Sequence, residues 1–242
     1  MRDYNSEAQS RPEKRYDYNF DEIVRDYMMK RFAPHFQSGP ALELGCHEGR
    51  STQLLSQHFP DLTVVEASSD ALAVAKRNAP ETVTFINSTF EEAKFDKTFR
   101  SIFLINTLEH LEETGPVLRN IRDWLAPDGQ FYVLVPNADA PSRQIAVQMG
   151  LIESNNAVTP GEWAHGHRRT YSFDTLEADV RAAGMKIEQR GGLMFKALAN
   201  FQFDRALAAG IIDENYLEGI YNLGMIYPAM CASIFLICSR AQ

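Results

Sequence analysis

Two glycines and a spaced acid predict a cradle for the nucleoside end of a cofactor. Gly45 and Gly49 lie in the turn over residues 43–49, which follows a short apolar run and precedes a predicted helix. Glycine lets a backbone turn tightly and approach a ligand closely. The β-rich run over residues 62–65 ends on Glu66, 21 residues after Gly45. A βαβ unit places a carboxylate against ribose hydroxyls at a spacing of about 20 residues.

The residues of the same turn indicate which class of cofactor it can bind. A dinucleotide fingerprint is G-x-G-x-x-G, whereas His47 stands at the second glycine position here. Glu43, Glu48 and Glu66 surround the turn and no lysine lies in it. This charge repels phosphate and suits a cationic or neutral ligand. S-adenosylmethionine (SAM) fits, because it carries a sulfonium, an ammonium and a ribose but no phosphate.

Composition excludes several classes of protein. The 242 residues, 45% of them apolar, are enough for one large domain. A net charge of −8 argues against a nucleic-acid partner. No apolar run approaches the ~20 residues of a membrane span, and the N-terminus lacks the apolar core of a signal peptide. Cys46, Cys231 and Cys238 form no C-x-x-C pair, so we expect reduced thiols in the cytoplasm.

Predicted strands and helices alternate up to residue 137. Strands are predicted over residues 41–44, 62–66, 82–86, 100–105 and 130–135, and helices over 20–32, 51–59, 70–78 and 117–125. Such alternation predicts an α/β fold with a parallel sheet and helices on both faces. Residues 1–14 are polar, and we expect them to be mobile unless a ligand orders them. We therefore treat residues 1–36 as an N-terminal lid and helix.

The pattern changes after residue 137. Residues 138–166 are predicted to be an insertion with helical segments over 141–150 and 160–165, acting as a lid or a homodimer contact. A helix over 173–183 and a strand over 185–189 follow. Residues 198–227 are predicted to be mostly helical with breaks at Gly210 and Gly224, and residues 232–238 form a buried last strand. We expect residues 1–242 to form a single domain.

The residues just after each strand are the candidate ligand contacts, since parallel sheets bind ligands at the carboxyl ends of their strands. They carry carboxylates, amides, hydroxyls and one aromatic ring, Phe90, that could lie against an adenine. The cofactor-binding candidates are Glu43, Gly45, Gly49, Glu66, Ala67, Ser88, Thr89, Phe90, Asn106 and Thr107.

At these positions the chain resembles the class I SAM-dependent methyltransferases. Residues 43–49 match the first motif of that family, with His47 in place of its middle glycine, and residues 64–68 match its acidic second motif. Residues 106–110 match the segment after the fourth strand in the subgroup that includes ubiquinone-type methyltransferases, and residues 125–137 match the turn and fifth strand. The resemblance implies a Rossmann-like, seven-stranded, mostly parallel sheet whose last strand is antiparallel.

The resemblance also implies roles for individual residues. Glu66 would hold the ribose hydroxyls, Gly45 would approach the methionine part, and Thr89 and Phe90 would flank the adenine. The backbone at Asn106 would receive the SAM ammonium. Tyr16 and Tyr18, which precede the first helix, would help to close a lid over the cofactor.

Methyl transfer to a small molecule is the leading interpretation. The reaction is an in-line displacement at a carbon that the sulfonium already activates, so the protein must mainly position the acceptor and exclude water. The catalytic candidates are His110, Asn137, His167 and Tyr171. His110 is either a general base near the acceptor or a residue packed beside the second βα unit. S-adenosylhomocysteine would be the product.

No metal site is predicted. His165 and His167 could face one ion, but no cysteine, aspartate or third histidine is adjacent in the sequence. A zinc site requires three or four ligands.

Two alternatives remain. The chain is also similar to azetidine-2-carboxylate synthases in its tyrosine-rich N-terminus and in residues 167–171. There SAM is the sole substrate: its amine attacks its own side chain and methylthioadenosine leaves, with Tyr132, Tyr171 and Asn137 expected to orient the reacting groups. The other alternative is a protein that binds SAM or a partner without chemistry.

Overall fold

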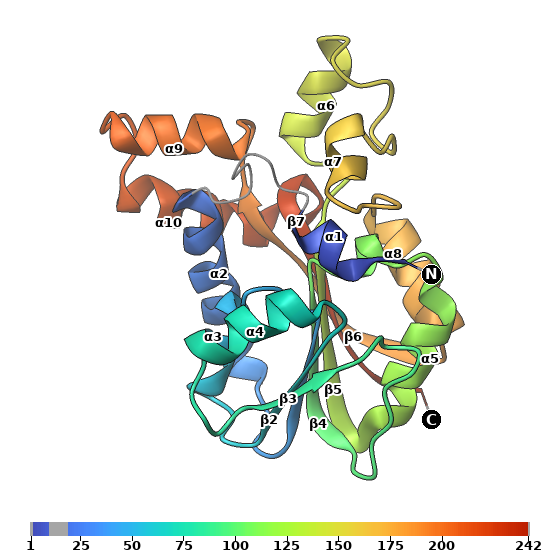
Figure 1. Ribbon diagram of the computed structural model, residues 1–242. Coiled ribbons are helices and arrows are strands. Elements are labelled where there is room, and N and C mark those ends of the chain that lie inside the picture. Colours follow the sequence, from blue (N-terminus) through green and yellow to red (C-terminus); the bar gives the residue numbers. More distant parts are fainter. Residues whose placement is uncertain (1, 10–18, 242) are drawn as a thin grey trace.

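The structure is a computed structural model that describes residues 2–9 and 19–241. Seven strands form one sheet in the order β3-β2-β1-β4-β5-β7-β6 (Figure 1). They are β1 (Ala41–Leu44), β2 (Leu62–Glu66), β3 (Thr84–Asn87), β4 (Phe99–Ile105), β5 (Leu125–Pro136), β6 (Met185–Phe195) and β7 (Cys231–Arg240). Only β7 runs antiparallel to its neighbours. The predicted Rossmann-like sheet with an antiparallel last strand is confirmed.

Helices cover both faces of the sheet, because alternate side chains of its buried strands point to opposite sides. Leu42 and Leu44 of β1 belong to the core that includes α5 (Thr114–Trp124) and α8 (Phe173–Ala182). Ala41 belongs to the opposite core, which draws on the remaining long helices. These are α2 (Asn19–Phe32), α3 (Arg50–Ser56), α4 (Ser69–Asn78), α9 (Asn200–Ala208) and α10 (Glu214–Ile226).

Side-chain caps fix where the helices next to the strand ends begin. The Ser68 hydroxyl accepts a hydrogen bond from the Ala71 N–H and so starts α4 two residues after β2 ends. Ser172 caps α8 in the same way through the Thr175 N–H. Each cap sets the length of a loop at the edge of the sheet where ligands are expected.

Three of the differences from the sequence prediction come from contacts between distant segments. β6 continues to Phe195, since Gly191 lies beneath the ring of Phe235, only 2.4 Å from where a Cβ would stand. β5 begins at residue 125, because residues 126–129, predicted as a turn, continue the strand. Gly224 does not break a helix; it lies inside α10, where the missing side chain makes room for the Cys231 thiol.

The remaining helices are short. They are α1 (Tyr4–Gln9), α6 (Pro141–Gln148), α7 (Pro160–Ala164) and the 3₁₀ turns η1 (Ala33–His35), η2 (Leu108–His110) and η3 (Pro228–Met230). Figure 1 shows α6 and α7, both from the predicted insertion, projecting from the body beyond α1. α1 lies in the segment that was expected to be mobile and contacts α4. Within the described residues, no helix combines the length and apolarity needed to cross a bilayer.

Candidate active site

A cavity of about 1320 Å³ lies at the carboxyl ends of the parallel strands. Loops that follow five strands contribute to its lining, through residues 45–48, 66–68, 89–91, 105–107, 109–111 and 136–137. The insertion contributes Arg143 and Glu162 among others, so this segment takes part in the cavity. The volume exceeds that of a typical small-molecule pocket, which leaves room for a cofactor and a second reactant.

The glycine turn after β1 keeps a glycine-like path despite the histidine in it. Gly45, His47 and Gly49 all have positive φ, at 78°, 47° and 85°. Histidine tolerates this left-handed region better than most residues, although the conformation is strained for any L side chain. A Cβ on Gly45 would lie 2.7 Å from the Thr107 side chain, and one on Gly49 would lie 3.0 Å from Ala75. The turn is therefore wedged between two neighbouring segments.

Glu66 binds this turn from the end of β2. Its Oε2 accepts a hydrogen bond from the His47 N–H at 3.0 Å, and its Oε1 accepts one from the Ser68 N–H at 2.9 Å. Burial raises the pKa of the Glu66 carboxyl group, and these backbone donors act against that rise. Each carboxylate oxygen keeps a second acceptor site, so the group can also receive hydroxyls from the cavity that it lines.

Three of the predicted cofactor contacts do not line the cavity. Glu43 is buried beneath the turn, where its Oε2 accepts a hydrogen bond from Thr52 Oγ at 2.6 Å. Burial raises the pKa of Glu43 to about 8. Gly49 lies at the start of α3, and the Ser88 hydroxyl donates to the Thr89 carbonyl. These residues support the turn and the β3 loop from outside the lining.

The other predicted contacts of described residues do line the cavity. They are Gly45, Glu66, Ala67, Thr89, Phe90, Asn106 and Thr107. Asn106 has φ of 47°, and its N–H donates to the Leu134 carbonyl, so its carbonyl is the backbone group left for a ligand. Tyr16 and Tyr18 lie outside the described residues.

α1 connects two parts of the cavity rim that the sequence did not link. Asn5 hydrogen-bonds the hydroxyls of Ser68 and Ser69 at the start of α4. Arg2 donates to the His110 carbonyl at 2.8 Å, and Glu7 pairs with Arg2 and with Arg168. No periodicity or motif in residues 2–9 signals these long-range contacts.

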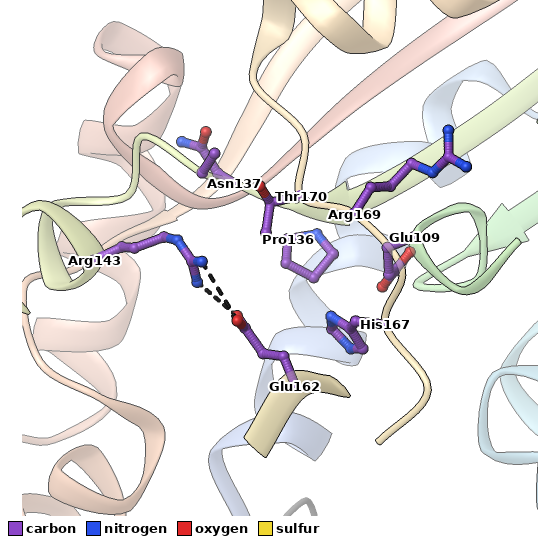
Figure 2. Close-up of a pocket in the computed structure, with 9 residues that line it drawn as sticks. Glu109, Pro136, Asn137, Arg143, Glu162, His167, Arg169 and Thr170 are labelled. Atoms are coloured by element: carbon purple, nitrogen blue, oxygen red, sulfur yellow. Dashed lines mark hydrogen bonds and ion pairs between the residues drawn. The ribbon is translucent and has the colours of Figure 1, made fainter. Parts of the chain in front are cut away.

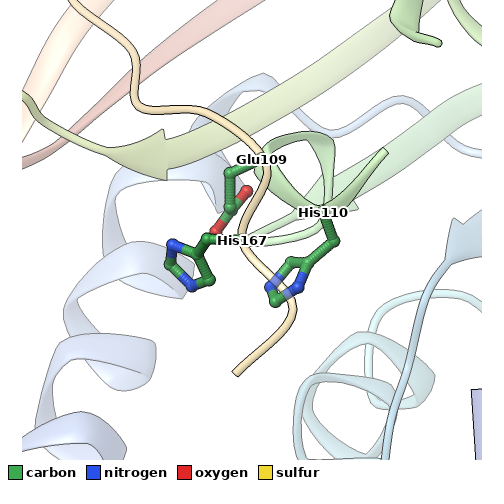
Figure 3. Close-up of side chains that lie close together, drawn as sticks. All are labelled: Glu109, His110 and His167. Carbon is green, nitrogen blue, oxygen red and sulfur yellow. The ribbon is translucent and has the colours of Figure 1, made fainter. Parts of the chain in front are cut away.

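Two of the catalytic candidates meet on the wall of the cavity. The rings of His110 and His167 contact edge to face, with their centroids 4.6 Å apart. Glu109 reaches the same point from η2, and Figure 3 shows its carboxylate beside both imidazoles. Burial raises the pKa of Glu109 to about 8 and lowers the pKa of His167. Sequence reasoning passed over Glu109, although it lies inside the matched segment 106–110.

The other two candidates are held by structural hydrogen bonds. The Asn137 amide donates to the carbonyls of Ala229 and Cys231 while its residue lines the cavity (Figure 2). Tyr171 is 2% exposed and lies outside the lining, with its hydroxyl donating to Asp179 at 2.9 Å. Tyr132 is fully buried, and its hydroxyl donates to the His35 carbonyl. Neither tyrosine therefore contributes its hydroxyl to the described lining of the cavity.

Three charged side chains that sequence reasoning did not predict also lie at the cavity. Arg143 and Glu162 form an ion pair at 2.6 Å between α6 and α7 (Figure 2). Lys196, 6% exposed, lies over the rings of Phe20 and Phe203 and donates to the Leu198 carbonyl. Burial lowers its pKa to about 8.

Comparison with known protein families gives one match over most of the chain. A family model described as "Methyltransferase domain" matches residues 14–190. The chain is 24% identical over 196 residues to a ubiquinone biosynthesis O-methyltransferase of Azorhizobium caulinodans, covering 73% of this chain and 72% of that protein. It is 31% identical over 105 residues to a trans-aconitate 2-methyltransferase of Yersinia pestis, covering 42% and 40% of the two chains.

Solved structures share the fold at low sequence identity. The CcbJ methyltransferase of Streptomyces caelestis superposes with a TM-score of 0.66 at 14% identity, over 100% of both chains. The N-methyltransferase NodS of Bradyrhizobium japonicum, in complex with S-adenosylhomocysteine, gives a TM-score of 0.63 at 12% identity, over 99% of this chain and 98% of that one.

Proposed function

This chain belongs to the methyltransferase-domain family and is a SAM-dependent methyltransferase; from that premise we propose that it methylates a small molecule held in the cavity at the carboxyl ends of its strands. The observation that carries the proposal is the convergence of five strand-end loops on one cavity, with the Glu66 carboxylate at one side and the histidine pair at the other. The acidic net charge supports a small molecule over a nucleic acid as acceptor.

The order of the strands assigns the two ends of the cavity. β3 and β2 lie on one side of β1, and β4 and β5 lie on the other. Glu66 and Phe90 follow β2 and β3, so we assign the ribose and adenine to that side. Gly45 and Asn106 follow β1 and β4, where the methionine part would lie. His110 and His167 then stand on the β4–β5 side, where an acceptor would approach.

The residues at the cofactor side fit SAM. When bound, SAM supplies a methyl group on a positively charged sulfur. The lining holds more acidic than basic side chains, which suits that cation. Glu66 can accept ribose hydroxyls because its backbone bonds leave acceptor sites, and the bare Cα of Gly45 leaves backbone exposed to a ligand.

The residues at the acceptor side would bind and orient the acceptor and would exclude water from it. α1, α6 and α7 contribute to the cavity wall beside the histidines, which limits access of solvent to the reacting groups. The imidazole of His167 lines the cavity on this side, where it can contact and orient an acceptor.

A binding measurement tests the cofactor assignment. We expect Glu66→Ala to weaken SAM binding by about 10- to 100-fold in calorimetry, because a hydrogen bond to a charged group contributes roughly 1.5–3 kcal/mol. Glu48→Ala is the matched control, since it removes another carboxylate from the same lining without the bonds that Glu66 makes. Equal losses in both variants would mean that only the general charge of the rim matters.

Product analysis tests methyl transfer against intramolecular cyclisation of SAM. The placement of Tyr132 and Tyr171 away from the cavity lining removes two of the three residues that cyclisation was expected to use. With SAM alone we expect no turnover, and with an acceptor we expect S-adenosylhomocysteine. Accumulation of methylthioadenosine from SAM alone would refute methyl transfer as the main activity.

A further inference from the structure

Glu109, His110 and His167 bring three metal-ligand groups to one point. One ligand atom from each residue lies within 4.8 Å of the other two. Two of them are adjacent in η2, and the third arrives from the loop after α7, 57 residues along the chain. The loop is held there by the Arg168 N–H, which donates to the Glu109 carbonyl at 2.8 Å. The fold therefore brings together three possible metal ligands whose spacing in the sequence does not predict a site.

The Glu109 carboxylate points toward the two histidines (Figure 3) and has no hydrogen-bond partner among the described residues. The residue is 2% exposed, and neither carboxylate oxygen has a hydrogen-bond partner among the residues that the structure describes. Burying such a group without a partner is expensive. Figure 3 shows the carboxylate directed toward the two imidazole rings, so a partner placed between the three groups would satisfy it.

The cationic side chains near the cluster are bonded to other groups. Arg2 binds Glu7 and the His110 carbonyl, and Arg143 binds Glu162. Arg168 binds Glu7, and Arg169 donates to the carbonyls of residues 111 and 112. Within the described part of the chain, none of the four makes an ion pair with Glu109.

We propose that Glu109, His110 and His167 bind a divalent transition-metal ion on the acceptor side of the cavity. Two imidazoles and one carboxylate suit zinc, iron(II) or manganese(II), whereas magnesium prefers oxygen ligands. Ligands of a tetrahedral zinc lie about 3.4 Å apart, so modest side-chain rotations would close the set. This proposal departs from the sequence prediction of no metal site, which considered only ligands adjacent in the sequence.

The ion would also restrict which small molecules can serve as the methyl acceptor. This extension rests on the proposed function. Three protein ligands leave coordination positions open, and the cluster lines the cavity. An acceptor hydroxyl bound there would lose its proton to water more readily. The substrate class indicated is a small molecule with a metal-binding oxygen.

Metal titration of the full chain without SAM or acceptor tests the site. The chelator-treated protein is titrated with Zn²⁺ against a chromophoric chelator, and with Co²⁺ while its visible spectrum is recorded. We expect a single tight site, with His110→Ala, His167→Ala and Glu109→Gln each weakening Zn²⁺ binding by about 100-fold or more, since even outer partners of ligands contribute about 10- to 100-fold. Mg²⁺ should not compete.

His58→Ala is the matched control, because His58 is exposed near the end of α3 and belongs to no such cluster among the residues that the structure describes. It should leave Zn²⁺ affinity unchanged. Wild-type binding no tighter than that of His167→Ala, or an equal loss in His58→Ala, overturns the proposal. Circular dichroism identifies a variant that does not fold, and the remaining two variants then decide. Glu66→Ala should keep Zn²⁺ binding, which separates failure of this site from failure of the cofactor assignment.

Discussion

The buried Glu43 should make the stability of this protein fall as pH rises. Its pKa is about 8 in the folded protein because burial disfavours the charged carboxylate, against an ordinary value of 4.5. Between these two values the folded state holds a proton that the unfolded chain has released. The free energy of unfolding therefore decreases with rising pH across that window.

Replacing Glu43 by glutamine removes this dependence and keeps the shape. The glutamine oxygen can still accept the hydrogen bond from Thr52. One pH unit corresponds to about 1.36 kcal/mol, so the stability of Glu43→Gln relative to wild type should increase by about 3 kcal/mol from pH 5 to pH 8. Any constant offset from the new buried amide does not affect this slope.

Urea unfolding at pH 5, 6, 7 and 8, followed by tryptophan fluorescence, measures the difference. Glu48→Gln is the control, because it removes an exposed carboxyl group from the same turn; an equal slope with pH in both variants would mean that the effect does not come from the buried group. A flat difference for Glu43→Gln would show that the buried carboxylate is ionised and compensated in the folded protein, and would refute the reasoning.

Two further predictions concern the turn and the buried lysine. Gly45→Ala should lower the free energy of unfolding by about 2–3 kcal/mol, since it adds a clash with Thr107 to the strain of positive φ. Gly210→Ala, at φ 65° with open space around it, should cost about 1–2 kcal/mol; equal losses would mean that the clash is relieved. Lys196→Met should stabilise the protein by about 2 kcal/mol at pH 7, because burial lowers the pKa of this amine from 10.5 to about 8 while its bond to Leu198 contributes roughly 1 kcal/mol. Below pH 8 the folded state carries the full penalty, so this gain should shrink from pH 8 to 10.5 in chemical denaturation; a gain that stays constant with pH would contradict the assignment.

The sequence predicted the parts of the fold that local patterns determine. The strand of residues 62–66 was placed correctly because its β-branched run ends at a single acid and a capping serine. The antiparallel last strand followed from family resemblance and not from its residues, since an apolar run does not encode direction. The turn at Gly45 and the acid at Glu66 face one cavity because the carboxyl ends of parallel strands share an edge.

What the sequence did not predict depends on contacts between distant segments. The predicted strand over residues 185–189 ended before Gly191 and Gly192, yet these glycines continue it, because Phe235 and Cys231 occupy the space where their side chains would be. Glu109 comes close to a second and third ligand group only because the loop that carries His167, 58 residues later, folds back onto it. The sequence around Lys196 did not predict its burial, because the aromatic rings that surround it come from α2 and α9.

The position of β7 has a consequence for synthesis on the ribosome. β7 lies between β5 and β6, so both strands keep an unpaired edge until residues 231–240 have been made. Phe235 and Leu236 then complete opposite cores in one step, since they belong to different clusters. A nascent chain that stops before this point exposes apolar strand edges that favour association with other chains. Pairing in the half of the sheet that contains β5, β6 and β7 is therefore completed only once residues 231–240 are available, whereas β1 to β4 can pair earlier.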